Sequence, residues 1–250
     1  MTVLGIDIGG SGIKGAPVDV KTGEFLEERF RIPTPSPSKP EQVIDVIQLI
    51  VEHFNWDGKI GAGFPGVVRR GVIGTAANVS KDWIGQNLAK LIRDATGNKT
   101  IVLNDADAAG LAEMRFGCGK KYEDETVLFL TIGTGIGSAL FVKRELWPNS
   151  ELGHLKIRGK DAERIAGDGV RSDKDLSWKK WGKRLNKVLR LYDFLLNPDV
   201  IIIGGGVSKK FEYYGKYLKK INAEVIPAVL KNQAGVVGAA MAAAESIIID

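Results

Sequence analysis

The residues best suited to proton transfer occur in the short run "NDAD". Asn104, Asp105 and Asp107 stand where an apolar strand, residues 100–104, ends and a predicted helix begins. In α/β proteins this end of a strand places side chains against a ligand. A carboxylate there can accept the proton of a hydroxyl that attacks phosphorus, and Asn104 can orient it. Because Asp is also a favoured helix N-cap, we assign Asp105 to catalysis and Asp107 to capping.

Two glycine-rich turns, "GGSG" at 9–12 and "GTGIG" at 133–137, have the composition of phosphate sites. Each follows an apolar strand and leads into another strand, so neither is a Walker A loop or a Rossmann fingerprint. Glycines let backbone N–H groups face outward and let an anion approach the chain. The alternative is that both are ordinary hairpin turns. We favour phosphate binding because there are two such turns and both have Ser, Thr or Lys side chains in or beside them. The predicted phosphate-binding residues are Gly9, Gly10, Ser11, Lys14, Thr131, Gly133, Thr134, Gly135 and Gly137, with Ser138 beside them.

Asp7 ends an otherwise apolar strand just before the first of these turns. A carboxylate in such a place is costly unless it has a partner. Asp7 could bind Mg²⁺, directly or through water, or it could cap the glycine turn. Lys14 could neutralise a phosphate as a point charge. We therefore expect Mg²⁺ as cofactor, near Asp7.

A strongly basic run, "WKKWGKRLNKVLR", is predicted to form one side of a helix, with apolar residues on the other. Most such runs are solvated faces. Beside a phosphate site, a basic track with two tryptophans could instead guide a long polyanion through counterion release. No RNA- or DNA-binding module is recognisable, so a linear inorganic polyanion is the better candidate. The predicted track comprises Lys179, Lys180, Lys183, Arg184 and Lys187.

Composition restricts the class of protein. The 250 residues are 44% apolar, enough for a large core, and Lys and Arg outnumber Asp and Glu by 35 to 30, which permits an anionic ligand without implying one. The single cysteine, Cys118, excludes an internal disulfide framework, and two histidines make a structural zinc site improbable. The first residues, "MTVLGIDIGG", are typical of a buried strand, not of a signal peptide, and no apolar run is long enough to span a bilayer. We expect a cytoplasmic protein without membrane or nucleic-acid partners.

Periodicity predicts a repeated α/β pattern. Each half contains a β-hairpin with a glycine turn, followed by α/β units, which is a weak internal duplication. This predicts two lobes around one cleft: residues 1–104 with about 235–250, and residues 105–234. The stretch "PTPSPSKP" should be an exposed extended connector. Predicted strands cover 3–8, 13–20, 25–32, 59–64, 100–104, 126–132, 138–142 and 200–203, and helices cover 41–53, 87–96, 106–115, 178–196 and 235–246.

Several stretches carry a resemblance to a known family. They are "DIGGSGIKGAPVD", "TAANV" followed by a Trp, "LNDADAAGLAE", "LTIGTGIGSA", "PNSELGHL" and "IIIGGGVS". Together they resemble the sugar-kinase/Hsp70/actin superfamily and, within it, the ROK sugar kinases, nearly from end to end. The resemblance implies an α/β fold of the two-lobed, actin-like ATPase (ribonuclease H-like) type, with its active site in an interlobe cleft. It also suggests a homodimer.

The resemblance implies Mg²⁺-dependent transfer of a terminal phosphoryl group to the 6-hydroxyl of glucose, giving glucose 6-phosphate. By matching positions, Asp105 would be the general base. The remaining glucose-binding positions would be Gly66, Asn78, Asn104, Glu151, His154 and Glu163. If ATP is used, the adenosine would face the turn formed by Gly204, Gly205, Gly206 and Ser208.

One departure from the family pattern bears on the phosphoryl donor. Typical ROK kinases carry a zinc-binding cysteine cluster shortly after the "GH" motif, whereas "GHLKIRGKDAERIAG" contains no cysteine. The resemblance therefore implies no zinc site in this chain. Polyphosphate-using members of the family also lack the cluster, so we predict inorganic polyphosphate as donor, with ATP use left open. The alternatives are a strictly ATP-dependent glucokinase or hexokinase and, less favoured because the catalytic residues are intact, a non-catalytic sugar-sensing or actin-like assembly protein.

Overall fold

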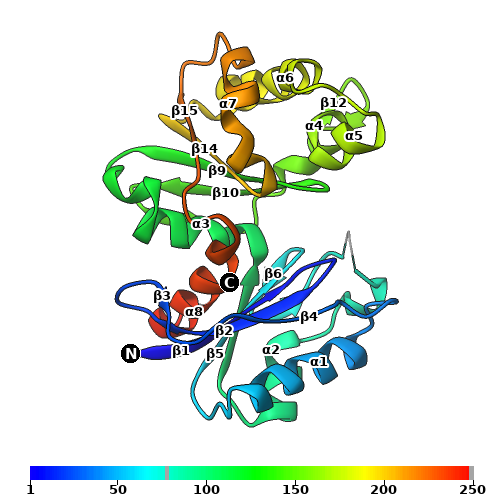
Figure 1. The fold of residues 1–250 in the computed structure, drawn as a ribbon, viewed down its shortest axis with the longest axis vertical. Helices are drawn as coiled ribbons and strands as arrows, with labels where there is room; N and C mark the ends of the chain where they lie inside the picture. The colour runs from blue at the N-terminus through cyan, green and yellow to red at the C-terminus, as the bar shows by residue number, and fades with distance from the viewer. Residues whose placement is uncertain (77–78, 248–250) are drawn as a thin grey trace. The chain divides into compact units, whose positions relative to one another are not determined.

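The computed structural model describes residues 1–76 and 79–247. The chain forms two compact units, unit 1 (Met1–Ala112 with Gln233–Asp250) and unit 2 (Glu113–Asn232). The division falls inside helix α3 (Asp105–Phe116), whereas the sequence placed it before Asp105. Asp105 therefore belongs to unit 1 together with the strand that precedes it. Figure 1 shows the fold as a ribbon with most of its helices and strands labelled.

Unit 1 is built on a mixed sheet with the order β3-β2-β1-β5-β8, and β4 also pairs with β2. β1 (Thr2–Ile8) and β2 (Ile13–Asp19) form the expected antiparallel hairpin, and β5 (Ile60–Phe64) and β8 (Thr100–Asn104) continue parallel to β1. The single strand predicted over 25–32 is wrong. Two short strands, β3 (Glu24–Phe25) and β4 (Phe30–Ile32), pair with β2 instead, separated by the largely exposed charged stretch 26–29.

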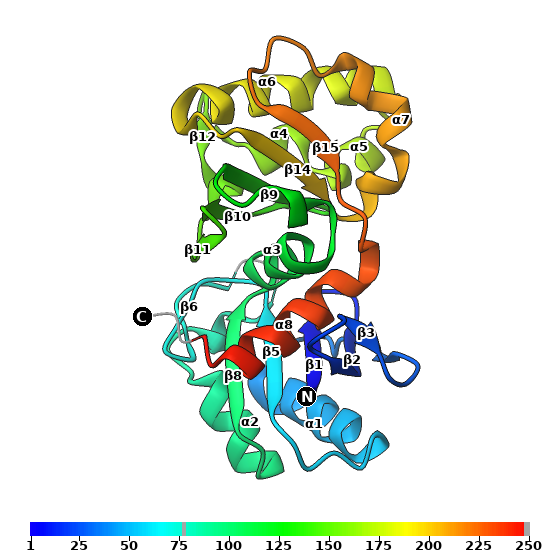
Figure 2. The same cartoon turned by 90° about the vertical axis from the view of Figure 1, so that its left-hand side faces the viewer.

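Helices cover both faces of this sheet. Leu4 and Ile6 of β1 share a core with the apolar stripe of α1 (Pro40–His53) and with α2 (Leu88–Thr96). Successive strand residues point to opposite faces, so Gly5 points the other way, toward α8 (Ala234–Glu245). Figure 2 shows α8 on the face of the sheet opposite α1 and α2.

Glycine allows α8 to approach the sheet at backbone distance. A Cβ atom on Gly5 would lie 2.0 Å from the carbonyl oxygen of Val236, and one on Gly61 would lie 1.8 Å from that of Ala239. On the helix side, a Cβ on Gly238 would come within 1.6 Å of the Ala108 oxygen. Gly5 and Gly61 in the strands, and Gly238 in α8, therefore lie at contacts in which no side chain fits.

Unit 2 repeats this strand arrangement. Its sheet has the order β11-β10-β9-β14-β15, in which β9 (Thr126–Ile132) and β10 (Ile136–Val142) are an antiparallel hairpin. β14 (Val200–Gly204) runs parallel to β9 and to β15 (Glu224–Pro227), as β5 runs parallel to β1 and β8. The internal duplication expected from sequence is therefore present in the strand topology.

The long helix of unit 2, α6 (Trp178–Leu196), has the predicted bounds. Short elements were not foreseen: α4 (Glu163–Ala166), α5 (Asp168–Asp173), α7 (Phe211–Tyr214), β11 (Glu145–Trp147), the pairs β6 (Val68–Arg69) with β7 (Val72–Ile73) and β12 (Lys156–Ile157) with β13 (Lys160–Asp161), and the 3-10 turns η1 (Lys81–Trp83), η2 (Cys118–Lys121), η3 (Leu152–His154), η4 (Gly206–Lys210), η5 (Gly215–Tyr217) and η6 (Lys231–Gln233). Among the described residues, no helix combines the length and apolar character needed to cross a membrane.

The packing of α8 on β5 predicts a sharp difference between two glycines of one strand. Gly61→Ala should lower the free energy of unfolding by about 3 kcal/mol, because its new methyl group meets backbone. Gly63→Ala is the matched control, since the nearest atom to its Cβ, Asp105 Cα, lies at an ordinary 3.5 Å. Urea unfolding of both variants measures the difference; equal stabilities would contradict this account of the α8 contact.

Candidate functional site

The first glycine turn joins β1 to β2. It is closed by a hydrogen bond of 3.2 Å from Gly9 N–H to Gly12 C=O. The amides of the exposed Gly10 and Ser11 donate to no acceptor within the described part of the chain. Side chains from the β4 segment occupy the neighbouring carbonyl oxygens: Thr34 Oγ1 donates to Gly9 and Arg31 Nη2 donates to Ser11, at 2.5 and 2.7 Å. The turn therefore offers unused N–H groups while the carbonyl oxygens of Gly9, Ser11 and Gly12 each accept a hydrogen bond, an arrangement suited to an anion.

Asp7 and Lys14 face each other across the β1–β2 hairpin. Lys14 Nζ donates to Asp7 Oδ2 at 3.0 Å, and both side chains are about one-fifth exposed, 24% and 19% respectively. The lysine predicted to bind phosphate and the carboxylate predicted to bind Mg²⁺ are thus partners beside the turn. The sequence did not anticipate this ion pair.

The donor atoms around Asp7 allow a test of the expected magnesium site. No group of three or more His, Cys, Asp or Glu side chains is arranged for a metal within residues 1–76 and 79–247. Mg²⁺ commonly uses one or two carboxylates and takes its other ligands from water and substrate phosphates. Asp7, partly exposed beside a turn with unused amides, fits that mode of binding and does not fit an all-protein site.

Asn104, at the end of β8, is held by hydrogen bonds to α3 and to Gly66. Its side-chain oxygen accepts from the backbone N–H groups of Ala106 and Asp107 at 2.8 and 3.1 Å, and its Nδ2 donates to Gly66 C=O at 3.1 Å. The N-cap of α3 is therefore Asn104. The assignment of Asp107 as the cap is wrong, because Asn104 accepts the Asp107 amide hydrogen bond and Asp107 itself is fully buried in the first turn.

Asp105, the predicted base, is the partly buried first residue of α3. Because Asn104 caps the helix, the Asp105 side chain is not needed for that purpose. Gly66, the sugar-loop residue bonded to Asn104, leaves no room for a side chain, since its Cβ would lie 2.3 Å from the Thr75 oxygen. Asn104, Asp105 and Gly66 are thus brought together in unit 1, whereas Asn78 lies outside the described residues.

The second glycine turn, between β9 and β10, is closed by Gly133 N–H and Gly135 C=O at 3.1 Å. The start of α5 supports it: the amides of Asp168 and Gly169 donate to Gly133 C=O at 2.7 and 3.2 Å. A Cβ on Gly169 would come within 2.9 Å of Thr134 C=O. The sequence analysis missed this support, although the spaced glycines of "AGDGV" were a usable signal.

Ser138 does not belong to the anion site. It is buried, its hydroxyl donates to Ser150 C=O at 2.6 Å, and it accepts from Leu152 N–H at 3.0 Å. Its side chain therefore connects β10 to the segment that carries η3. Thr131 and Gly137 are partly buried opposite each other in the β9–β10 hairpin, next to the turn.

Three predicted sugar-binding residues form a cluster in unit 2. His154 Nε2 lies 3.6 Å from Glu151 Oε2, and His154 Nδ1 lies 3.9 Å from Glu163 Oε1. Glu163 Oε2 also accepts from Ile136 N–H at 3.4 Å, which links the cluster to the second glycine turn. Burial raises the pKa of Glu151, and the charge of Glu163 raises it further, against an opposing effect of His154. The cluster offers both donors and acceptors to hydroxyl groups.

The basic track on α6 is largely solvent-exposed. Within the described residues, its lysines and Arg184 form no ion pair with a carboxylate. The two tryptophans differ: Trp178 is partly exposed, with the Arg171 guanidinium 4.3 Å from its ring centroid. Trp181 is buried and donates to the carbonyl oxygens of Ala166 and Gly167. Trp181 therefore cannot contact a polyanion as proposed; it anchors α6 to the segment that supports the second turn.

A family model described as "ROK family" matches residues 3–170, about two thirds of the chain. The chain belongs to the ROK family. The polyphosphate glucokinase of Mycobacterium tuberculosis is 46% identical over 240 residues, which cover 96% of this chain and 90% of the relative. The counterpart from Mycobacterium leprae is 43% identical over 98% of this chain and 75% of its own length.

Solved structures of ROK proteins have the same fold. The inorganic polyphosphate/ATP-glucomannokinase from Arthrobacter sp. strain KM matches with a TM-score of 0.93 and 43% identity, over 98% of this chain and 99% of that one. The ROK family glucokinase from Streptomyces griseus, solved with glucose and AMPPNP, matches with a TM-score of 0.82 and 25% identity. The match covers 98% of this chain and 100% of that one. The predicted family and the predicted α/β, actin-like fold class are confirmed.

The "GGG" turn of this ROK protein lies next to the second glycine turn. Gly204 ends β14 in register with Thr131 of β9. Gly205 has φ 76° and would place a Cβ 2.4 Å from Ile132 C=O, so only glycine fits there. Ser208 is buried and its hydroxyl donates back to Gly205 C=O at 2.9 Å. Its side chain therefore stabilises the turn. Gly206 is the exposed residue of this turn, and a Cβ atom built on it would have no neighbour within 4 Å.

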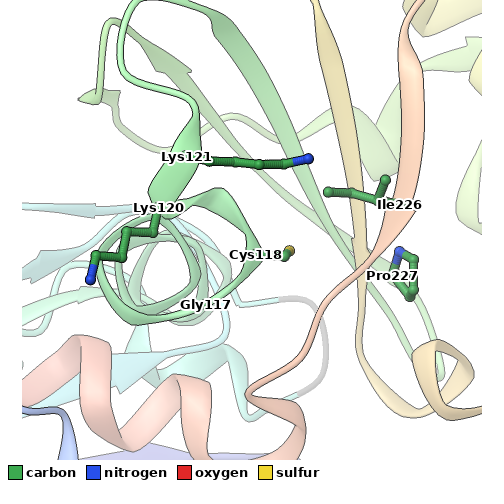
Figure 3. Close-up of a pocket in the computed structure, with 6 residues that line it drawn as sticks. All are labelled: Gly117, Cys118, Lys120, Lys121, Ile226 and Pro227. Atoms are coloured by element: carbon green, nitrogen blue, oxygen red, sulfur yellow. The ribbon is translucent and has the colours of Figure 1, made fainter.

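A cavity of about 560 Å³ lies elsewhere in unit 2, after α3, and contains none of the predicted site residues. Its lining residues are Gly117, Cys118, Lys120, Lys121, Ile226 and Pro227. Figure 3 shows Lys121 extending toward Ile226. The Cys118 thiol donates to Glu113 Oε2 at 3.6 Å, and Glu113 is fully buried. Burial, together with the Glu113 charge, raises the pKa of Cys118 to about 12.

This pKa predicts an unreactive thiol. Only the thiolate is alkylated, so native Cys118 should react with iodoacetamide far more slowly at neutral pH than an ordinary cysteine, and faster as the pH rises. The same protein unfolded in urea is the control, because unfolding removes both burial and Glu113. Equal rates in the native and unfolded states would contradict the assigned environment.

Proposed function

We propose that this ROK protein transfers the terminal phosphoryl group of inorganic polyphosphate, or of ATP, to the 6-hydroxyl of glucose, giving glucose 6-phosphate. The observation that carries the proposal is the 46% identity to the polyphosphate glucokinase of Mycobacterium tuberculosis over 96% of this chain. The geometry supports it, since each unit contains a glycine turn suited to phosphate and a group of side chains suited to a sugar.

In the proposed reaction, Asp105 accepts the proton of the 6-hydroxyl as that oxygen attacks the terminal phosphorus. The bond from this phosphorus to its bridging oxygen breaks, and the donor leaves one phosphate shorter. Asn104 has the supporting role, because its hydrogen bonds to α3 and Gly66 fix the start of the helix that carries Asp105. Asn78 remains a predicted sugar-loop residue.

Glu151, His154 and Glu163 are the proposed sugar ligands of unit 2. Their mutual distances of 3.6 and 3.9 Å place charged acceptors and a ring nitrogen donor around one position. Neighbouring sugar hydroxyls, each both donor and acceptor, match such a set.

The two glycine turns are the proposed binding sites for donor phosphates. Unused amides of Gly10 and Ser11 would contact phosphoryl oxygens in unit 1, and the turn at Gly133–Gly135 would do so in unit 2. When bound, Mg²⁺ would neutralise charge on the phosphoryl oxygens, and Asp7 is the residue that would hold it through water. The cytoplasmic location and the homodimer expected from the sequence stay predictions.

The proposed base predicts a specific loss of activity. Asp105→Asn removes the proton acceptor while nearly preserving shape, so turnover should fall by at least ~100-fold with glucose affinity largely unchanged. Asp94→Asn, an exposed carboxylate on α2, is the control and should behave as wild type. Steady-state formation of glucose 6-phosphate and glucose binding by calorimetry measure the two effects. An active Asp105→Asn enzyme would refute the assignment of the base.

The donor assignment predicts a role for the basic track. Lys179→Ala combined with Lys183→Ala should raise KM for long-chain polyphosphate by about tenfold and flatten its salt dependence, since two phosphate contacts are lost. KM for ATP and for glucose should not change.

A second double variant, Lys120→Ala with Lys160→Ala, removes the same charge from other exposed positions of unit 2 and should leave polyphosphate use unchanged. An equal rise of the polyphosphate KM in both double variants would show that the effect comes from net positive charge and not from the track. Use of ATP alone by the wild-type enzyme would favour the ATP-dependent glucokinase.

A further inference from the structure

Three charged residues form a row beside the first glycine turn. Asp7 of β1 pairs with Lys14 of β2, and Lys14 pairs in turn with Arg31 of β4. Residues directly opposite in antiparallel strands project from the same face, with Cβ atoms about 5 Å apart. The row therefore contains two cations and one carboxylate at the end of the sheet where the donor phosphate is proposed to bind.

The carboxylate of this row is already paired. Lys14 Nζ lies 3.0 Å from Asp7 Oδ2, whereas Arg31 forms no ion pair anywhere in the described part of the chain. Like charges directly opposite each other in a sheet destabilise it. An anion bound beside Lys14 and Arg31 would remove that repulsion, so the uncompensated charge points to an anionic ligand.

The guanidinium of Arg31 lies against the turn itself. Its Nη2 donates to Ser11 C=O at 2.7 Å, and a Cβ on Gly12 would lie only 2.5 Å from Nε. Arginine has five N–H donors, of which this contact uses one. The remaining donors of an exposed side chain are thus held next to the unused amides of Gly10 and Ser11.

We propose that Arg31 binds the phosphoryl donor directly, as a second cation beside Lys14 in the first phosphate site. The ligand class is a condensed phosphate chain, whether inorganic or the triphosphate of a nucleotide. The guanidinium contacts non-bridging phosphoryl oxygens through charge-assisted hydrogen bonds. The identity of the donor rests on the proposed function. The presence of the anion site does not.

Three variants of Arg31 and one control test the assignment. Arg31→Gln removes the charge and keeps hydrogen-bonding capacity, Arg31→Ala removes both, and Arg31→Lys keeps the charge without the planar fork. Lys21→Ala is the control, because Lys21 is an exposed cation just beyond the opposite end of β2. Each protein is assayed for KM of donor and of glucose, and is titrated with inorganic tripolyphosphate by calorimetry in the absence of glucose.

We expect Arg31→Gln and Arg31→Ala to raise the donor KM and the Kd for tripolyphosphate by about tenfold or more, the loss typical of a hydrogen bond to a charged group. Glucose KM should stay unchanged, Arg31→Lys should recover part of the loss, and Lys21→Ala should match wild type. Unchanged tripolyphosphate affinity in folded Arg31→Gln overturns the proposal.

The titration separates this proposal from the proposed function. If the wild-type protein phosphorylates no glucose, yet its tripolyphosphate affinity falls in Arg31→Gln, the anion site stands and the glucokinase assignment fails. If the wild type is an active kinase whose donor KM and tripolyphosphate affinity are the same in all Arg31 variants, the kinase stands and Arg31 has no part in donor binding.

Discussion

A backbone turn that binds an anion must keep N–H groups unused, while the carbonyl oxygens beside them are satisfied elsewhere. In both glycine turns, carbonyl oxygens accept hydrogen bonds from distant parts of the chain. Thr34 and Arg31 occupy the Gly9 and Ser11 oxygens of the first turn. The amides of Asp168 and Gly169 occupy the Gly133 oxygen of the second. The short elements β4 and α5 are explained by this need, because each delivers its donors to a turn.

The same accounting of hydrogen bonds explains why the Asp105 side chain is not needed as the cap of α3. A helix start leaves backbone N–H groups that need acceptors, and an aspartate in the first turn would ordinarily compete to supply one. Asn104 supplies the acceptor instead, and its amide group is held in turn by Gly66. Asn104, which the sequence marks as a substrate ligand, thus also caps α3, so that neither neighbouring carboxylate is needed for that purpose.

Features that depend on a local sequence pattern were predicted correctly, whereas features that depend on contacts between distant residues were not. The hairpins, α1 and α6 were predicted with nearly the observed bounds because alternation and helical stripes are local patterns. The cap of α3 was misassigned because Asn and Asp are both good N-caps, and backbone conformation decides between them. Arg31 was missed because its position depends on the register of β4 with β2. The sequence grouped Trp181 with the basic track and Ser208 with a turn that faces a nucleotide, and it could not show that both are buried, because burial is a property of the tertiary fold.

Glu113 has a consequence for the architecture of the chain. Its Oε2 accepts from the Cys118 amide, and its Oε1 accepts from the Leu230 amide at 2.6 Å. Unit 2 is one continuous segment, so this carboxylate joins its first residue to a residue near its end. A segment whose ends meet can be accommodated within a host domain at little cost in loop-closure entropy. Unit 2 therefore has the form of a domain insertion, and such a segment can lengthen or change internally without altering the two points at which it joins unit 1.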